Sequence, residues 1–297
     1  MPQKTAVIGL GSMGYGIAQS VLRAGHEAYG FDVNAERCRA FAAEGGRPGP
    51  LAEIAPELDT VIVVVLNAQQ TEEVLFGAEG VVAALKPGSV VLSCATIPPD
   101  VARDLAARAD AVGVHYLDAP ISGGAVKAAA GQLTIMAAGA SAAFAAAAPT
   151  LDAIAETVFD LGEVGAGSAM KAVNQLLAGV HIVSMAEALT FGMTQGVQPE
   201  KFVEVISKCA GTSWMLENRA PHIVAGDYTP HSAVNIWLKD LGIVLDIAKG
   251  GQFSAPLTAA ALQQFVAAAG QGLGAEDDAA VAKVYARNAG LTLPGET

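Results

Sequence analysis

The sequence has few charged residues, and basic residues are the scarcer kind. Charged side chains make up 15% of the 297 residues, and 17 lysines and arginines stand against 29 aspartates and glutamates. The net charge of −12 argues against nucleic acid and against an anionic membrane as partners, because both attract positive protein surfaces. An anionic substrate would need a locally positive pocket.

Cysteine is also scarce. Cys38, Cys94 and Cys209 are far apart in the chain and odd in number. They lack the close spacing of metal-binding cysteines, so we expect no metal site. Unpaired cysteines of this kind are typical of reduced thiols inside the cell, and we expect a cytoplasmic protein.

Long apolar runs and leader sequences are not evident. The run of large apolar residues Val61–Leu66 has the length of a strand and falls far short of the roughly 20 residues of a membrane-spanning helix. A β-type run begins within a few residues of the start, which leaves no room for a signal peptide. The hydrophobic content of 52% and mean hydropathy of +0.41 predict a compact soluble protein of one large or two ordinary domains.

Short β-type runs alternate with helical patterns up to about residue 160. The expected strands are Thr5–Ile8, Glu27–Phe31, Thr60–Leu66, Ser89–Ser93, Val114–Leu117, Gln132–Gly139 and Thr157–Asp160. This alternation predicts a doubly wound α/β sheet, a Rossmann domain over residues 1–163. Residues 164–297 are expected to form an all-helical domain for substrate binding and oligomerisation, led by a long helix over Ser168–Gln195.

A glycine-rich motif directly follows the first expected strand. It reads Gly9-Leu10-Gly11-Ser12-Met13-Gly14 and is followed by a helical pattern and a second strand that ends in Asp32. In such a motif the glycines permit a tight turn, a close approach of the backbone to a pyrophosphate, and close helix–strand packing. The pyrophosphate would lie at the helix N-terminus. The arrangement predicts a dinucleotide-binding site.

Asp32 bears on the choice of dinucleotide. A carboxylate at this position hydrogen-bonds the ribose hydroxyls of NAD and repels the 2′-phosphate of NADP. No guanidinium follows until Arg37, which is expected inside the next helix. We therefore predict that the cofactor is NAD.

The long helix over Ser168–Gln195 is apolar nearly all round, which predicts a core position. Among its few polar residues, Lys171 and Asn174 share one face. A lysine near the start of a buried helix loses hydration and faces the positive end of the helix dipole. Lys171 therefore needs a carboxylate partner, a lowered pKa or a chemical role, unless its amine reaches solvent at a domain edge.

Two further segments follow expected strands. The loop Ser122-Gly123-Gly124 offers unhindered backbone N–H groups and a hydroxyl, which suit a carboxylate or phosphate. An ordinary strand–helix turn is the alternative for this loop. Thr96 is either a hydroxyl beside the nicotinamide ribose or a plain helix N-cap.

Four motifs in this order resemble those of the β-hydroxyacid dehydrogenases, the family of 3-hydroxyisobutyrate dehydrogenase and tartronate semialdehyde reductase. The resemblance runs from Val7 to about Gly290, nearly the whole chain. The motifs are the glycine-rich loop, Asp118–Gly124, the segment from Gly165 through Lys171 to Asn174, and Lys239-Asp240-Leu241.

The resemblance implies NAD-dependent oxidation of a small hydroxy acid. Lys171 would take the hydroxyl proton in oxidation and return it in reduction, and Asn174 would orient the substrate. Many members carry two asparagines here, whereas Asn174 is followed by Gln175, so either amide could do the orienting. Ser122, Gly123 and Gly124 would hold the substrate carboxylate. The implied cofactor-binding residues are Gly9, Leu10, Gly11, Ser12, Met13, Gly14, Asp32, Leu66, Asn67, Thr71, Thr96 and Lys239.

Within the family, the runs Asn174–His181 and Ser213–Arg219 are most similar to the L-threonate dehydrogenase branch, which oxidises L-threonate to 2-oxo-tetronate. The alternatives are a 3-hydroxyisobutyrate dehydrogenase or a glyoxylate-type reductase of tartronate or succinic semialdehyde. The family is commonly dimeric or tetrameric, so a homodimer or homotetramer is expected.

Two other interpretations are disfavoured. Asp32 argues against an NADPH-dependent imine or aldehyde reductase, and Lys171 argues against the members with a different residue at that position. A catalytically inactive cofactor-binding module is disfavoured by the presence of Lys171 and by the acidic composition.

Overall fold

The computed structural model describes residues 2–296, which form two compact units. The first unit ends at Lys171 and the second begins at Ala172. The boundary lies inside one continuous helix, α8 (Ala166–Thr194).

The first unit is built on a five-stranded parallel sheet with strand order β2-β1-β3-β4-β5. Its strands are β1 (Lys4–Ile8), β2 (Glu27–Phe31), β3 (Thr60–Val63), β4 (Val90–Ser93) and β5 (His115–Asp118). The order reverses between β1 and β3, and ligands of such sheets bind at the carboxyl ends of the strands beside this reversal. The predicted Rossmann sheet is confirmed.

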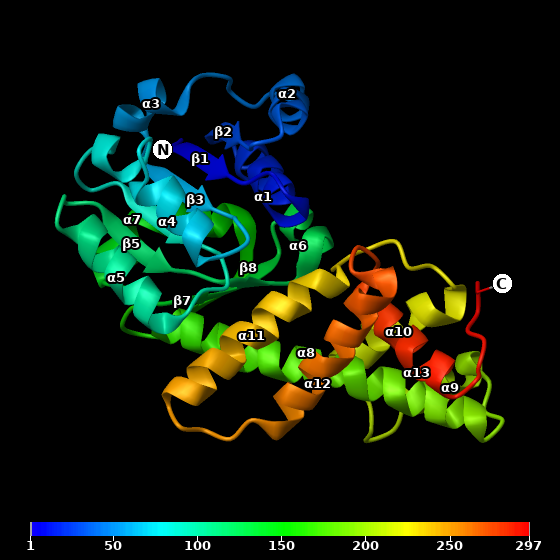
Figure 1. Cartoon of the computed structure of the whole chain (residues 1–297). Helices are drawn as coiled ribbons and strands as arrows, with labels where there is room; N and C mark the ends of the chain where they lie inside the picture. The colour runs from blue at the N-terminus through cyan, green and yellow to red at the C-terminus, as the bar shows by residue number, and fades with distance from the viewer. Residues whose placement is uncertain (1, 297) are drawn as a thin grey trace. The chain divides into compact units, whose positions relative to one another are not determined.

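Helices cover both faces of this sheet (Figure 1). Their bounds are α1 (Ser12–Arg23), α2 (Ala35–Ala43), α3 (Leu51–Ile54), α4 (Ala68–Phe76), α5 (Pro99–Asp110), α6 (Gly124–Ala130) and α7 (Ser141–Ile154), with 3-10 turns η1 (Ala55–Glu57) and η2 (Val82–Ala84). Val7 packs with α1, α6 and α7 on one face, whereas Ala6 and Ile8 pack with α4 and α5 on the other. Because side chains alternate along a strand, burial on both faces requires the nearly continuous apolar strands seen here.

The later strands do not extend the main sheet as the sequence suggested. β6 (Ile121–Ser122), β7 (Leu133–Ala137) and β8 (Ala155–Asp160) form a separate three-stranded sheet, with β6 antiparallel and β8 parallel to β7. β6 continues in the direction of β5, because an isolated antiparallel bridge pairs Asp118 with Ala138 just before Ile121 and Ser122 pair antiparallel with β7. β3 is also shorter than predicted and ends at Val63.

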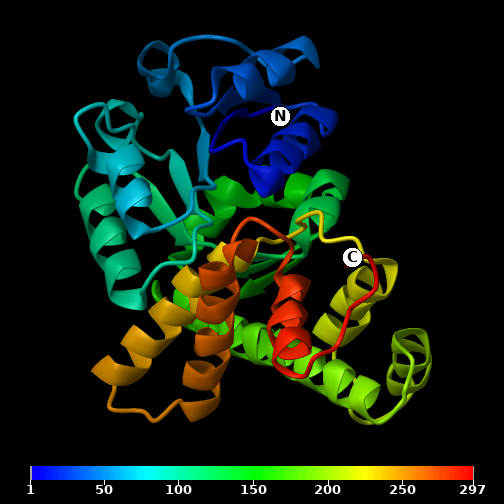
Figure 2. The same cartoon turned by 45° about the vertical axis from the view of Figure 1, so that its right-hand side comes forward.

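The second unit is helical, as predicted. After α8 come α9 (Pro199–Ile206), α10 (Trp214–Ala225), α11 (Val234–Gly250), α12 (Pro256–Ala268), η3 (Ala269–Leu273), η4 (Asp278–Ala280) and α13 (Val281–Asn288). Figure 2 shows α11 and α12 as an antiparallel pair in orange. Trp237 of α11 stacks on Phe265 of α12 with ring centroids 5.6 Å apart, inside a core that also takes in Ile182 and Leu189 of α8.

α8 is less buried than its composition predicted. Leu177 and Phe191 are 49% and 66% exposed. By length and composition α8 is the one helix within residues 2–296 that could cross a membrane, although the apolar sequence suggested none, and 39% of its most apolar window is buried. A core helix of a soluble protein meets the same criterion, so this is weak evidence for a membrane span.

Candidate active site

The glycine-rich loop has the shape that a dinucleotide requires. Gly9 has a φ of +97°, and a β-carbon there would overlap the carbonyl oxygen of Val64. A β-carbon on Gly14 would overlap the carbonyl oxygen of Gly9. Gly11 differs, because the nearest atom to a β-carbon at this position would be Nη1 of Arg37, 4.0 Å away. The loop is therefore tightly packed at Gly9 and Gly14 and open at Gly11. No side chain caps the start of α1, which leaves the N–H groups of its first turn available to an anion.

Asp32 lies beside this loop at the end of β2. One carboxylate oxygen accepts the N–H of Leu10 at 2.7 Å and the other accepts the N–H of Asn34 at 2.8 Å. Arg37 reaches back from α2 and donates to the carbonyl of Leu10 at 2.5 Å. Asp32 is thus hydrogen-bonded to the glycine-rich loop, as its predicted role requires. The guanidinium of Arg37, which lies inside the next helix, also contacts this loop.

Leu66, Asn67 and Thr71 form one capped turn after β3. Asn67 caps α4 by accepting the N–H of Gln70 at 2.9 Å, and the N–H of Leu66 donates to the side chain of Gln70 at 2.9 Å. Thr71 is fully buried and its hydroxyl donates to the carbonyl of Asn67 at 2.8 Å. Thr71 therefore supports the turn from inside, whereas Leu66 is exposed.

Thr96 follows β4 at the carboxyl edge of the same sheet. It is buried, and the N-cap of α5 is Pro98, so the plain N-cap alternative does not hold. Nearby, burial raises the pKa of the Cys94 thiol to about 12, with a smaller effect from the charge of Asp118. Cys94 is therefore protonated at neutral pH and is not a nucleophile.

Lys171 contacts the segment that carries the predicted carboxylate loop. Its Nζ donates to the carbonyl oxygen of Ile121 at 2.9 Å, and Ser122 is the next residue. Gly123 and Gly124 have φ values of +133° and +73°, a conformation that favours glycine at both positions. The first unit therefore brings Lys171 and the Ser122–Gly124 loop together.

In the second unit, the remaining predicted residues form one hydrogen-bonded chain. Asn174 donates to Oε1 of Gln175 at 2.9 Å, and Nε2 of Gln175 donates to Oδ2 of Asp240 at 2.6 Å. Oδ1 of Asp240 lies 2.7 Å from Nζ of Lys239. Gln175 and Asp240 are 7% and 3% exposed. Sequence reasoning missed the role of Asp240, although its place beside Lys239 in a motif was a signal.

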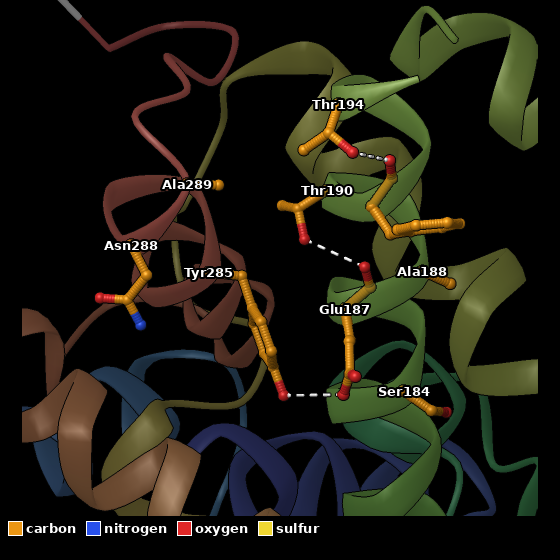
Figure 3. Close-up of a pocket in the computed structure, with 9 residues that line it drawn as sticks. Ser184, Glu187, Ala188, Thr190, Thr194, Tyr285, Asn288 and Ala289 are labelled. Carbon is orange, nitrogen blue, oxygen red and sulfur yellow. Dashed lines mark hydrogen bonds between the residues drawn. The ribbon is translucent and has the colours of Figure 1, made fainter. Parts of the chain in front are cut away.

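The structure also has a groove that contains none of these residues (Figure 3). It lies between α8 and α13, has a volume of about 660 Å³, and is lined by side chains such as Glu187, Phe191 and Tyr285. Tyr285 donates to Glu187 at 3.2 Å across it. Within residues 2–296, no group of three or more His, Cys, Asp or Glu side chains could hold a metal ion.

Two family models match consecutive parts of the chain. The NAD binding domain of 6-phosphogluconate dehydrogenase matches residues 4–162. The NAD-binding domain of NADP-dependent 3-hydroxyisobutyrate dehydrogenase matches residues 165–285.

Individual proteins are similar over nearly the full length. The L-threonate dehydrogenase of Cupriavidus necator is 50% identical over 298 residues, which cover 100% of this chain and 99% of that protein. The L-threonate dehydrogenase of Escherichia coli O6:H1 is 46% identical, and the matched region covers 97% of this chain and 96% of that protein. The crystal structure of 3-hydroxyisobutyrate dehydrogenase from Salmonella typhimurium has a TM-score of 0.88 at 46% identity, covering 94% of this chain and 99% of that one. Together with the site geometry, these similarities show that the chain is an NAD-binding oxidoreductase of the β-hydroxyacid dehydrogenase family.

Proposed function

We propose that this chain oxidises L-threonate at its 2-hydroxyl to 2-oxo-tetronate, with NAD as the oxidant. The observation that carries the proposal is the 2.9 Å hydrogen bond between Lys171 and the carbonyl of Ile121. It holds a proton acceptor next to a loop suited to the substrate carboxylate. The full-length similarity to L-threonate dehydrogenases supports this choice of substrate.

Lys171 acts as the general base. When bound, NAD supplies the nicotinamide ring that takes the hydride from C2. As that C–H electron pair leaves, the O–H proton passes to Nζ of Lys171 and the hydroxyl oxygen becomes a carbonyl oxygen. Ser122, Gly123 and Gly124 bind the carboxylate, which sets the distance between the 2-hydroxyl and the lysine. In reduction, Lys171 returns the proton.

Asn174 is the amide that orients the substrate. Gln175 is buried, and both ends of its amide are bound, to Asn174 and to Asp240. A glutamine held in this way supports its neighbours and has little capacity left for a ligand. We therefore assign substrate contact to Asn174 and support to Gln175.

The residues assigned to the cofactor likewise divide into those that contact it and those that support the contacting residues. The glycine-rich loop would hold the pyrophosphate of the cofactor through Gly9, Leu10, Gly11, Ser12, Met13 and Gly14. Asp32 would hold the adenosine ribose, which would select NAD over NADP. Leu66 and Asn67 would bind the adenosine side of the cofactor, and Thr71 supports their turn through its hydrogen bond to Asn67. Thr96 and Lys239 would each serve the nicotinamide end of the cofactor, and Asp240 holds Lys239 in place through their ion pair.

The protein works in the cytoplasm as a homodimer or homotetramer. Three cysteines without disulfides fit a reducing compartment. Exposed apolar residues on α8, among them Leu177 and Phe191, fit a surface that contacts another subunit. Light scattering coupled to gel filtration measures the mass in solution, and a monomeric mass would refute the oligomer.

NADH formation at saturating NAD tests the activity, with L-threonate, D-threonate, D-glycerate, 3-hydroxyisobutyrate and L-serine as substrates. We expect a clear preference for L-threonate. Turnover of 3-hydroxyisobutyrate or glycerate alone would keep the family and overturn the substrate. Lys171→Met should abolish turnover and leave NADH binding intact, whereas Lys201→Met, which alters an exposed lysine on α9, should change neither.

A further inference from the structure

Asp118 is a fully buried carboxylate that binds the start of α8. It lies at the end of β5 and accepts the backbone N–H groups of Gly165 at 3.0 Å and Ser168 at 2.8 Å, both on Oδ2. Its Oδ1 accepts the hydroxyl of Ser168 at 2.6 Å. All of these groups belong to the first unit.

α8 depends on this contact for its N-terminal cap. The first N–H groups of any helix lack partners within the helix. α8 has no acidic residue in its first turn, and the chain enters it through Gly165 with a φ of +98°. The acceptor therefore comes from Asp118, which is 47 residues before Gly165 and 50 before Ser168. A carboxylate at this end of a helix also interacts favourably with the helix dipole.

The backbone around Asp118 is packed against the same turn. A β-carbon on Gly167 would lie 2.5 Å from the carbonyl oxygens of both Asp118 and Met136. Only glycine allows so close an approach to the ends of β5 and β7. The first turn of α8 is thus held by a side chain and by close backbone packing.

We propose that Asp118 is a positioning residue for Lys171, and this proposal rests on the general-base role given to that lysine. The segment from Asp118 to Ile121 contacts α8 at two levels. Asp118 binds its first turn, and the carbonyl of Ile121 accepts the Lys171 amine one turn later. Because the same segment continues into Ser122, Asp118 sets the distance between the amine and the carboxylate loop.

The hydrogen bonds of Asp118 determine which substitutions are informative. An asparagine can accept both backbone N–H groups with its oxygen and donate its amide to Ser168, whose hydroxyl can change from donor to acceptor. Asp118→Asn therefore keeps the contacts, and Asp118→Ala removes all of them. Ser168→Ala removes the 2.6 Å bond and leaves both backbone bonds. Burial raises the pKa of Asp118, against the hydrogen bonds from Ser168 and Gly165 and the charge of Arg103.

The test measures kcat, KM and NADH affinity for the full-length variants. Displacing a catalytic group by about 1 Å costs on the order of 100-fold in rate, so we expect Asp118→Ala to lower kcat between tenfold and 100-fold. NADH affinity should stay within about twofold, because the glycine-rich loop is untouched. Asp118→Asn should restore most of kcat. If Asp118→Ala does not fold, Ser168→Ala carries the test, with a smaller loss of kcat at unchanged NADH affinity.

A second measurement does not depend on turnover. With ¹³Cε-labelled lysine, the NMR signal of Lys171 is assigned by its loss in Lys171→Met. It should shift in Asp118→Ala and Ser168→Ala and stay near the wild-type position in Asp118→Asn. Wild-type kcat and an unshifted signal in folded Asp118→Ala would overturn the positioning role, as would equal losses in Asp118→Ala and Asp118→Asn. Absence of turnover in the wild type on every hydroxy acid would refute the proposed function alone.

Discussion

Gln175 donates a side-chain hydrogen bond to Asp240 over 2.6 Å, and the same carboxylate holds Lys239 at 2.7 Å. One buried aspartate thus links the amide pair of α8 to the lysine of α11. A movement of Asp240 would displace both the group assigned to the substrate and the group assigned to the cofactor.

Gln175→Ala should lower kcat about tenfold, which is about 1.4 kcal/mol of transition-state stabilisation. The reason is that Asn174 loses the partner that fixes its orientation. Steady-state kinetics with L-threonate measures the effect. Gln195→Ala is the matched control, because Gln195 is an exposed glutamine just beyond the same helix. A variant with wild-type kcat would show that Asn174 needs no support.

Asp240→Asn should mainly weaken the binding of the cofactor. It removes the charge that pairs with Lys239 and keeps the size of the side chain. We expect KM for NAD to rise several-fold, with a smaller change in KM for the hydroxy acid. Asp246→Asn, at an exposed position on α11, is the control. A rise in KM for the hydroxy acid alone would contradict the assignment of Lys239.

Ser122→Ala should raise KM for the hydroxy acid about tenfold, the value of one hydrogen bond to a charged group. The change in kcat should be small, because the carboxylate is bound equally in the ground state and the transition state. Ser184→Ala, on the exposed side of α8, provides the comparison. Loss of kcat at constant KM would mean that Ser122 acts on the reacting hydroxyl instead.

Asp32→Ser should relax the choice between NAD and NADP. The substitution removes the repulsion of a 2′-phosphate and leaves Arg37 beside the loop. We expect kcat/KM to fall for NAD and to rise for NADP. Adding Arg37→Met should cancel the gain with NADP, because that guanidinium is the nearby cation. An unchanged ratio of kcat/KM for NAD to kcat/KM for NADP would show that other residues determine the cofactor selectivity.

The free energy of unfolding should depend on pH through Asp277. Burial alone would raise its pKa, but hydrogen bonds from the N–H groups of His231 and Ala279 and from the ring of His222 hold it below the usual 3.8. The ionised carboxylate therefore stabilises the fold above the unfolded-state pKa, and this contribution is lost as the pH falls through the lower folded-state pKa.

Urea unfolding of wild type and Asp277→Asn at several pH values measures this contribution. The difference in unfolding free energy between the wild type and Asp277→Asn should be largest near neutral pH and should become smaller in acid. Asp277→Ala should cost about 3 kcal/mol at neutral pH, because it also leaves His222 and two backbone N–H groups without their acceptor. A gap that widens on acidification would reverse the sign of the linkage.

Features with a local cause could be predicted from the sequence. The glycine-rich loop and Asp32 lie within one strand–helix–strand unit, and each glycine has a backbone reason that a sequence pattern preserves. The same holds for Asn34, whose side chain caps α2 by accepting the N–H of Glu36.

Features that depend on distant contacts could not be predicted. Asp118 finds its partners 47 and 50 residues away, and Gln175 lies 65 residues from Asp240. The separation of β6, β7 and β8 into their own sheet follows from the choice of hydrogen-bond partners, about which strand periodicity says nothing. The exposed apolar side of α8 likewise depends on which neighbours cover that helix.

Since the first unit ends inside α8 and Asp118 takes its partners from that helix, the nucleotide-binding part cannot be separated at the end of its last strand. A fragment that stops at Asp160 would leave the Asp118 carboxylate without the three hydrogen bonds it now accepts. Fragments and chimaeras therefore need the chain through Lys171. A recombination that exchanges helical halves between family members would preserve both parts only if its crossover point falls within the helix itself.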